Sequence, residues 1–509
     1  MKAKKQEVNP TRRSFILKLS GMKFFNQINT FPGLLNFAPA KLFPLLIMVS
    51  TCLSAATQKK NSPPKGTMEV GIARIDITPY KPIRLSGYLR MDARINESEG
   101  VSQTLWAKAI AFGSDTQNPA IIITADLAGI QAHMVKEVAI KISKKRKFNP
   151  DNLVINTSHT HSGPDMGNSH NMYFDPLLPV DQLGRIAEYL DSLTIKLEQV
   201  ALAALDNRKP AFVAWGQGTV NFAMNRRVIK DGKWVGHGQV PDGPVEHSMP
   251  LMRITNTAGK LRSVLVGYGC HGTTLIYDKN TVHGDWIGEA QRIMEENHPG
   301  IIALVAQGCG GNADPAKRNT LEYAAMHGKS IADEADRLLK TNLIPLTVPP
   351  VVRTKKIQLP FDHVPDAEEF IAMTEEGGAK GHNAEVHLER IVRGVPIETA
   401  LTYPIECFSF GDKLAMLFLG GEVTAEYSLR LKKELGADRL WINAYTNDVK
   451  AYIPTKKMIP EGGYEVEGSM YYYDHPFRFS DTIENRIIKA VYGVLPPAFT
   501  SKVKKPLRN

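Results

Sequence analysis

Two histidines one residue apart, His159 and His161, carry the most suggestive chemistry in the sequence. They follow an apolar run, residues 153–155, that predicts a short buried strand, and Gly163 with Pro164 ends it in a turn. Because side chains alternate faces along a strand, both imidazoles are expected to point the same way at its open end. Such a pair is either half of a metal site or one packed and one solvated histidine.

Other reactive side chains recur at the same kind of position, where a predicted strand gives way to a loop. A buried strand over residues 264–268 leads to His271, and another apolar run ends at Glu422. Strand 301–306 leads into a glycine loop, which either offers backbone amides to an oxyanion or is a tight structural turn. Glu422 is alternatively a dipole partner for a helix predicted over residues 423–435. In α/β proteins, binding sites form at this edge of a sheet.

The elements that position these residues predict an α/β fold, with mixed β-sheets flanked by helices. The run over residues 121–125 is apolar throughout, so we expect a strand that is buried on both faces. Asp126 after it either orients a ligand or caps a turn. Apolar positions spaced three and four apart predict a core helix over residues 182–205. A second helix is expected after Asp285, with that residue as its N-cap.

The charge of the chain is concentrated at its beginning. The 509 residues carry a net charge of +10, and residues 1–65, with eleven Lys and Arg and one Glu, account for all of it. The remainder is neutral, so bulk electrostatics gives no reason to expect a nucleic-acid partner.

The basic leader is typical of an export signal. Residues 11–18 resemble a twin-arginine signal, and the apolar run 42–49 is too short to span a membrane. This run precedes Cys52, which resembles the lipidated residue of a lipoprotein; the alternative is a true start at Met22 or Met48. We therefore expect an exported protein of the periplasm or cell surface, with a lipid anchor at Cys52.

The expected domain plan has four parts. Residues 1–52 are the export signal, 53–66 a tether, 67–500 a single catalytic domain, and 501–509 a tail. The three cysteines beyond residue 52 are widely spaced and odd in number, so we expect buried free thiols and no disulfide framework.

Taken together and in order, these motifs resemble the catalytic N-terminal domain of the neutral/alkaline (non-lysosomal) ceramidases, which are zinc-dependent amidases. The motifs that carry the resemblance are residues 76–79, 86–88, 159–164, 225–226, His271, 307–315 and 421–422. The resemblance implies an extent of about residues 68–500.

The resemblance also implies the roles of individual residues. His159, His271 and Glu422 match the family's Zn²⁺ ligands. The position of the fourth ligand, a tyrosine in the family, falls on Asp448, and Tyr452 is the competing candidate. A further pair, His161 and Arg226, would lie beside the reacting carbonyl.

Two departures from the family pattern bear on the substrate. Asp314 stands where the family has a serine in the glycine loop, which excludes covalent catalysis through that hydroxyl. We also expect no C-terminal immunoglobulin-like domain, since few residues follow position 500. These differences predict a substrate other than ceramide.

The leading hypothesis is a zinc hydrolase that cleaves an amide or ester, with His161 or Asp314 carrying a proton. The alternative is a zinc-dependent lyase or dehydratase acting on uronic-acid oligosaccharides, in which Tyr452, His161 or Asp314 moves protons. The tyrosine-rich segment 464–473 would suit a saccharide, or it packs within the protein. A third possibility is a metal-binding surface protein without catalysis. The sequence leaves the oligomeric state open.

Overall fold

The computed structural model describes residues 64–87, 96–167, 178–275 and 280–501. The predicted export signal with Cys52, nearly all of the tether, Tyr88 and most of the tail lie outside these residues. The chain divides into the units Met1–Asn61 and Ser62–Asn509, and every described residue lies in the second. No helix among the described residues is both long and apolar enough to cross a membrane.

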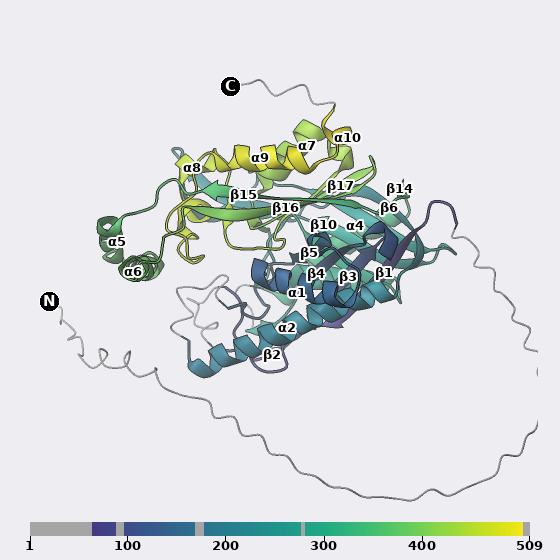
Figure 1. Cartoon of the computed structure of the whole chain (residues 1–509), viewed down its shortest axis with the longest axis horizontal. Helices are drawn as coiled ribbons and strands as arrows, with labels where there is room; N and C mark the ends of the chain where they lie inside the picture. Colours follow the sequence, from purple (N-terminus) through teal and green to yellow (C-terminus); the bar gives the residue numbers. More distant parts are fainter. Residues whose placement is uncertain (1–63, 88–95, 168–177, 276–279, 502–509) are drawn as a thin grey trace, which may run out of the picture. The chain divides into compact units, whose positions relative to one another are not determined.

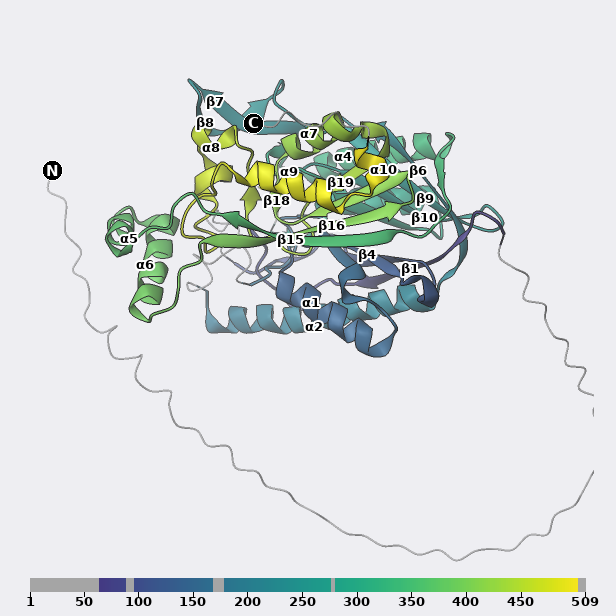
Figure 2. The same ribbon diagram turned by 45° about the horizontal axis from the view of Figure 1, so that its top comes forward.

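Two mixed β-sheets form the centre of the second unit (Figures 1 and 2). The larger sheet has the strand order β12-β10-β9-β6-β1-β3-β4-β5, with β14 paired to β6, and the smaller has the order β15-β16-β17-β19. The larger sheet consists of β1 (Met68–Asp76), β3 (Trp106–Phe112), β4 (Ala120–Ala125), β5 (Leu153–Thr157), β6 (Lys209–Thr219), β9 (Ser248–Asn256), β10 (Leu261–Tyr268), β12 (Ile302–Gln307) and β14 (Ile344–Leu346). The smaller consists of β15 (Val351–Pro360), β16 (Ala400–Phe410), β17 (Leu414–Leu419) and β19 (Leu440–Asn443).

Further strands and ten α-helices belong to the described part of the unit. These strands are β2 (Gly100–Val101), β7 (Ala223–Lys230), β8 (Lys233–Val240), β11 (Thr281–Val282), β13 (Ala313–Pro315), β18 (Glu422–Val423) and β20 (Tyr452–Ile453). The α-helices are α1 (Ala132–Lys145), α2 (Val180–Asp206), α3 (Asp285–Asn297), α4 (Leu321–Leu339), α5 (Ala367–Thr374), α6 (Gly378–Val392), α7 (Ala425–Leu435), α8 (Met458–Glu461), α9 (Ile483–Val494) and α10 (Pro497–Thr500).

The elements stack in four layers, helix, sheet, sheet and helix (Figure 1). Side chains of α1 and α2 pack on one face of the larger sheet, and α3 and α4 cover its β9-β10-β12 part. The opposite face packs against the smaller sheet through residues such as Leu265, Phe408 and Trp441. Helices α7 and α9 close the far side of the smaller sheet. The α/β fold with mixed sheets and flanking helices, predicted from the sequence, is confirmed.

Most local expectations hold, and one needs correction. β4 is buried on both faces, α2 covers the predicted core helix, and Asp126 accepts hydrogen bonds from the Trp106 N–H and the Gln291 side chain, a structural role. Asp285 is not the N-cap of α3: Gly284 is, and Asp285 is the first helical residue with φ of 56°. Its carboxylate instead accepts the N–H groups of Trp286 and Leu275, which holds the preceding loop.

Helices α5 and α6 form an excursion between β15 and β16 (Figure 1). They share a small core of Phe370, Met373 and Ala384, to which Tyr471 adds its ring. The excursion leaves the strand register intact, since β15 and β16 pair continuously from Val351 with Ser409. These helices therefore meet the body of the protein mainly at the tyrosine-rich segment.

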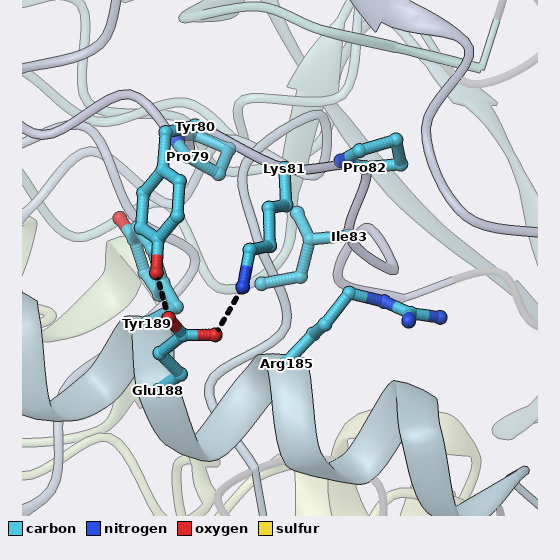
Figure 3. Close-up of a pocket in the computed structure, with 8 residues that line it drawn as sticks. All are labelled: Pro79, Tyr80, Lys81, Pro82, Ile83, Arg185, Glu188 and Tyr189. Atoms are coloured by element: carbon cyan, nitrogen blue, oxygen red, sulfur yellow. Dashed lines mark hydrogen bonds and ion pairs between the residues drawn. The ribbon is translucent and has the colours of Figure 1, made fainter.

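A small surface pocket lies against α2 (Figure 3). Residues 79–83 form one wall and Arg185, Glu188 and Tyr189 the other. The hydroxyl of Tyr80 and the ammonium of Lys81 both bond to Glu188, so hydrogen bonds join the two walls. None of the candidate site residues lines it.

A buried carboxylic acid on β16 predicts a pH-dependent stability. Burial raises the pKa of Glu406 to about 8, although Asn447 donates a hydrogen bond of 3.1 Å to it. A carboxyl whose folded pKa is raised contributes stability below its unfolded pKa, near 4.5, and loses that contribution as the pH rises toward 8. We expect the free energy of unfolding of Glu406→Gln to exceed that of wild type by a margin that grows from pH 5 to pH 8, by at most about 1.4 kcal/mol per pH unit.

Thermal unfolding across this pH range tests the expectation. Glu389→Gln, at a side chain 68% exposed, is the matched control and should follow wild type. A Glu406→Gln curve parallel to wild type at every pH would contradict the assignment.

Candidate metal centre

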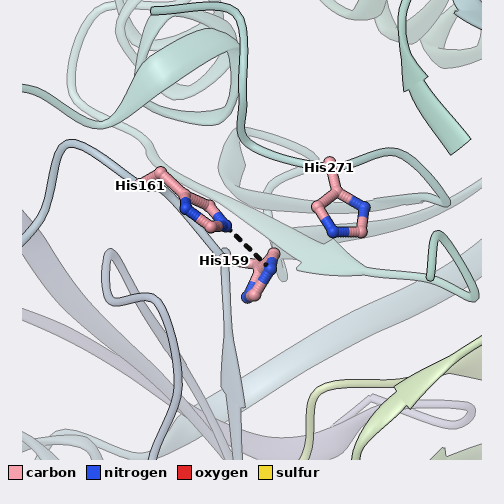
Figure 4. Close-up of side chains that lie close together, drawn as sticks. All are labelled: His159, His161 and His271. Carbon is pink, nitrogen blue, oxygen red and sulfur yellow. Dashed lines mark hydrogen bonds between the residues drawn. The ribbon is translucent and has the colours of Figure 1, made fainter. Parts of the chain in front are cut away.

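Three histidines from two loops converge in the structure (Figure 4). His159, His161 and His271 offer nitrogens that all lie within 4.8 Å of one another. The Nε2 atoms of His159 and His161 are 3.1 Å apart. The first and third rings are buried, and His161 is partly exposed. A cation could therefore be held by this group and still be reached from one side.

The two histidines of the pair meet for a reason other than strand alternation. β5 ends at Thr157, and His159 has φ of 57°, in the left-handed region that non-glycine residues rarely adopt. The predicted extended backbone is therefore wrong at His159, although the rings do meet. Gly272 makes the neighbouring turn possible, since a Cβ there would lie 2.6 Å from the carbonyl oxygen of His159.

Backbone carbonyls fix how the buried imidazoles face. The Nδ1 of His159 lies 2.6 Å from the carbonyl oxygen of Ala128, and the Nδ1 of His271 lies 2.7 Å from that of Gly310. Because each Nδ1 must donate its proton to a carbonyl, the Nε2 lone pair of the neutral ring faces the centre. Burial lowers the pKa of His271, and the charge of Arg226 lowers it further. Both effects favour the neutral ring that binds metals.

Glu422 completes the group from the smaller-sheet side of the molecule. Its Oε2 lies 3.0 Å from His159 Nε2 and 3.1 Å from His271 Nε2. Burial alone would raise the pKa of Glu422, but a positive charge at the two imidazoles, from a proton or a cation, holds it well below the usual value. Gly311 lets the chain pass here, since a Cβ on it would lie 2.4 Å from the carbonyl oxygen of Glu422. A carboxylate oxygen thus faces two imidazole nitrogens.

These donors fit a divalent cation. Tetrahedral ligands about 2.0–2.1 Å from a metal ion lie about 3.3 Å from one another, close to the 3.0 and 3.1 Å observed between Glu422 and the two rings. With each Nδ1 proton committed to a carbonyl, nitrogen lone pairs and a carboxylate oxygen face one another at contact distance. Such an arrangement is favourable only with a positive charge between them.

Tyr452 is the nearest tyrosine hydroxyl to the histidine nitrogens among the contacts described. Its oxygen lies 3.1 Å from His271 Nε2, and burial raises its pKa well above the usual value. β20 runs parallel to β18 in a register that pairs Tyr452 with Glu422, which places the two oxygen-bearing side chains together. Tyr445 packs its ring 4.6 Å from that of His159, and its hydroxyl has no hydrogen-bond partner among the described residues.

The structure does not bring Asp448 to the histidines. Its Oδ1 accepts the N–H of Ala132, 3.1 Å away at the start of α1, and its main-chain oxygen accepts the N–H of Gly421. Burial raises the pKa of this carboxyl. After Asp448, residues 449–451 return the chain to the centre, where Tyr452 lies. Of the two candidates for the fourth ligand, the contacts therefore favour Tyr452.

Arg226 and Asp314 lie beside the centre as a buried ion pair. The guanidinium donates to Asp314 at 3.1 Å, to Glu465 at 2.8 Å and to the Tyr452 hydroxyl at 3.1 Å. Burial alone would raise the pKa of Asp314, but Arg226 and Arg318 hold it below the usual value. An ionised Asp314 is suited to holding Arg226 and poorly suited to donating a proton.

Three backbone amides of the glycine loop are used within the protein. The N–H groups of Gly308, Gly311 and Ala313 all donate to backbone carbonyls, those of Tyr268, Val423 and Gly310. These three amides are therefore not available to an oxyanion. At these positions the loop has the role of a structural turn, the alternative to binding an oxyanion.

Two residues of the neighbourhood received no role from the sequence. Tyr473 donates a hydrogen bond to Glu422 Oε1, and Glu465 accepts from both Arg226 and Arg227. The only sequence signal was the density of tyrosines and glycines over residues 462–473. That pattern does not show which side chains contact the centre and which pack elsewhere, because this depends on the path of the chain after Gly462 and Gly463.

The layered α/β fold and the histidine-rich centre define a class of protein with a candidate metal site at the edge of its sheets. Residues 68–317 match the family model described as neutral/alkaline non-lysosomal ceramidase, N-terminal. The resemblance to this hydrolase family, read from the motifs, is confirmed. Glu422 and Tyr452 lie beyond the matched residues.

Curated relatives are similar over the same part of the chain. The neutral ceramidase of Drosophila melanogaster is 23% identical over 270 residues, and neutral ceramidase A of Dictyostelium discoideum is 24% identical over 250 residues. These matches cover 50% and 47% of this chain but 36% and 33% of the relatives. The chain thus matches about a third of the length of these proteins.

Solved structures share the fold more widely. A ceramidase complexed with C2 superposes with a TM-score of 0.63 at 16% identity, over 84% of this chain and 76% of that one. The neutral ceramidase from Pseudomonas aeruginosa gives 0.60 at 17% identity, over 83% and 75%. The fold therefore extends beyond the segment that sequence comparison matches.

Metal content tests the centre directly. We expect His159→Ala and His271→Ala to lose the bound ion, because each removes a nitrogen that faces Glu422. Asp448→Asn should retain it, because that carboxylate bonds to the start of α1. Elemental analysis of purified, folded variants gives the number of ions per chain, with His298→Ala, on a surface ion pair, as the control.

Two outcomes would contradict the assignment. Full metal content in both histidine variants would show that these two rings do not bind the ion. Loss of the ion in Asp448→Asn with both histidine variants loaded would move the centre to the other candidate.

Proposed function

We propose that the chain is a zinc-dependent hydrolase that cleaves an amide or ester bond. The observation that carries the proposal is the approach of Glu422 Oε2 to two Nε2 atoms that backbone carbonyls orient toward it. The two curated relatives described above are named neutral ceramidases, and their family consists of hydrolases, which supports the same reaction type.

The donor set supports zinc in particular. Imidazole nitrogens with one carboxylate suit Zn²⁺, and hard cations such as Mg²⁺ and Ca²⁺ prefer all-oxygen sites. His159, His271 and Glu422 would hold the ion, with the Tyr452 hydroxyl as the fourth donor. Bound there, zinc would polarise a substrate carbonyl and make water acidic enough to serve as the nucleophile near neutral pH.

The remaining residues would bind the substrate and move protons. Arg226 uses three of its five N–H groups on Glu465, Asp314 and Tyr452, so two N–H groups remain in its fork for a substrate oxygen, counted over the described contacts. His161 is partly exposed with its Nε2 toward the centre, a position suited to carrying a proton to the leaving group. Asp314, kept ionised, would hold Arg226 in place.

The substrate we propose is an acyl compound other than ceramide. Asp314 occupies the loop position at which the family pattern has a serine, and it adds a buried carboxylate with two arginine partners. A charged pair of this kind beside the centre favours a more polar substrate than a long-chain lipid, because burying it under an alkyl chain would cost free energy without a compensating bond.

A panel of N-acyl and O-acyl substrates tests this function. We expect turnover that a chelator abolishes and added Zn²⁺ restores, and a kcat about 10²-fold lower in Tyr452→Phe. The released acid or amine is the measurement, and Tyr492→Phe, whose hydroxyl donates to Glu434 on α7, is the control. Turnover that resists chelation would refute the metal-dependent mechanism.

The same panel separates hydrolysis from elimination. Incubation with uronic-acid oligosaccharides should give no new ultraviolet absorbance. A conjugated double bond formed there, without released acid or amine from the acyl panel, would replace hydrolysis with elimination as the reaction.

We also propose that the protein is exported and anchored through a lipid on Cys52. The support is the basic leader with its twin-arginine segment and the apolar run that precedes this cysteine. We expect the full chain to fractionate with membranes, Cys52→Ser to become releasable, and Arg12→Lys with Arg13→Lys to accumulate inside the cell. Wild-type protein found in the cytosolic fraction would contradict the proposal.

A further inference from the structure

One segment of the chain reaches both oxygen donors of the metal centre. This segment, residues 464–474, follows α8 through Gly462 and Gly463, whose φ values of 70° and 98° require glycine-like freedom. It begins as a single π-helical turn, Tyr464–Gly468, an uncommon geometry that often marks functional sites.

The first contact fixes the orientation of Glu422. Tyr473 donates its hydroxyl proton to Glu422 Oε1, while Oε2 faces His159 and His271. With one oxygen committed to a phenol, the carboxylate presents a single oxygen to the histidines and cannot turn to present both. Hydrogen bonds of this kind around a metal ligand typically change metal affinity 10- to 100-fold.

The second contact acts on Tyr452 through a guanidinium. Glu465 is fully buried and accepts from Arg226 Nε at 2.8 Å and Arg227 Nη1 at 2.6 Å. From this position Arg226 donates to the Tyr452 hydroxyl, which lies 3.1 Å from His271 Nε2. The partners hold the pKa of Glu465 well below its usual value despite its burial, so the bridge is an ionic one.

The segment is tied down on its outer side by the excursion between β15 and β16. Arg390 on α6 donates two hydrogen bonds to Asp474, of 2.7 and 2.5 Å, in the bidentate geometry that fixes both position and orientation. Arg478 adds a bond of 2.6 Å to Glu467. Residues 464–474 are therefore bonded to α6 on one side and to residues of the metal centre on the other.

We propose that residues 464–474 are the positioning segment of the metal centre, in which Tyr473 sets which oxygen of Glu422 faces the histidines and Glu465, through Arg226, sets the hydroxyl of Tyr452. This inference rests on the metal centre proposed above and extends it to two residues that touch neither the ion nor the substrate. A role in orientation can be distinguished from a role in packing. Replacing a residue that only packs by a side chain of the same shape would leave the binding of the ion unchanged.

The test measures the ion itself in the full-length protein loaded with Co²⁺ in place of zinc. The variants are Tyr473→Phe and Glu465→Gln, which keep shape and remove the hydroxyl or the charge. We expect Tyr473→Phe to weaken Co²⁺ binding about 10- to 100-fold in competition with a chelator. Both variants should change the visible absorption spectrum of bound Co²⁺, which reports the donor set and its geometry.

Tyr471→Phe is the matched control, since it removes a hydroxyl from the same segment while its ring stays in the core shared with α5 and α6. Its affinity and spectrum should equal those of wild type. Circular dichroism confirms that each variant is folded, and if Glu465→Gln does not fold, Tyr473→Phe alone decides.

The outcomes separate this inference from the proposed function. Wild-type affinity and spectra in both variants would overturn the positioning role and leave the metal centre intact. A change in one variant only would remove the other residue from the segment's role. A wild-type chain that binds no Co²⁺ or Zn²⁺ would overturn the metal centre, and with it the inference.

Discussion

The candidate centre depends on close approaches between neighbouring segments at three glycines. Gly272 lies against the backbone of His159, Gly311 against that of Glu422, and Gly87 against the ring of His161, where a Cβ would come within 2.6, 2.4 and 2.3 Å of the nearest atom. A side chain at any of these positions would push the neighbouring groups apart and disturb the distances that metal ligands require. These glycines therefore determine the geometry of the candidate centre, although none of their own atoms belongs to it.

Buried amides reinforce the same approach between the two sheets. Asn156 at the end of β5 accepts the N–H of Gln307 and donates to the carbonyl of Ala444, so one side chain joins the ends of three strands. Asn312 accepts the N–H of Ala425 and its main-chain oxygen accepts that of Arg226. Each of these groups is buried and paired, which makes the arrangement specific, because any shift would leave polar atoms unsatisfied.

The sequence predicted the parts of the structure that depend on local pattern. The apolar run of β4, the helical spacing of α2 and the order of strand-ending motifs were enough for the fold class. The same motifs carried the family resemblance, which brought His159, His271 and Glu422 into one hypothesis. The parts that failed depend on the path of the chain after a strand ends. The left-handed backbone of His159, the turn that carries Asp448 to α1, and the reach of Tyr473 to Glu422 are set by tertiary contacts with glycines and carbonyls far away in sequence. These contacts cannot be predicted from the spacing of residues along the chain.

The excursion that carries α5 and α6 has a consequence for how such proteins diversify. It leaves the smaller sheet after Pro360 and returns at Ala400, which are paired neighbours in the ladder, so its length does not alter the alignment of β15 and β16. Substitutions and insertions in these helices are therefore free of the constraints that bind the sheets. Because Arg390 in α6 bonds to Asp474 at the end of residues 464–474, a change in this excursion can alter the surroundings of the candidate centre while the sheets stay as they are.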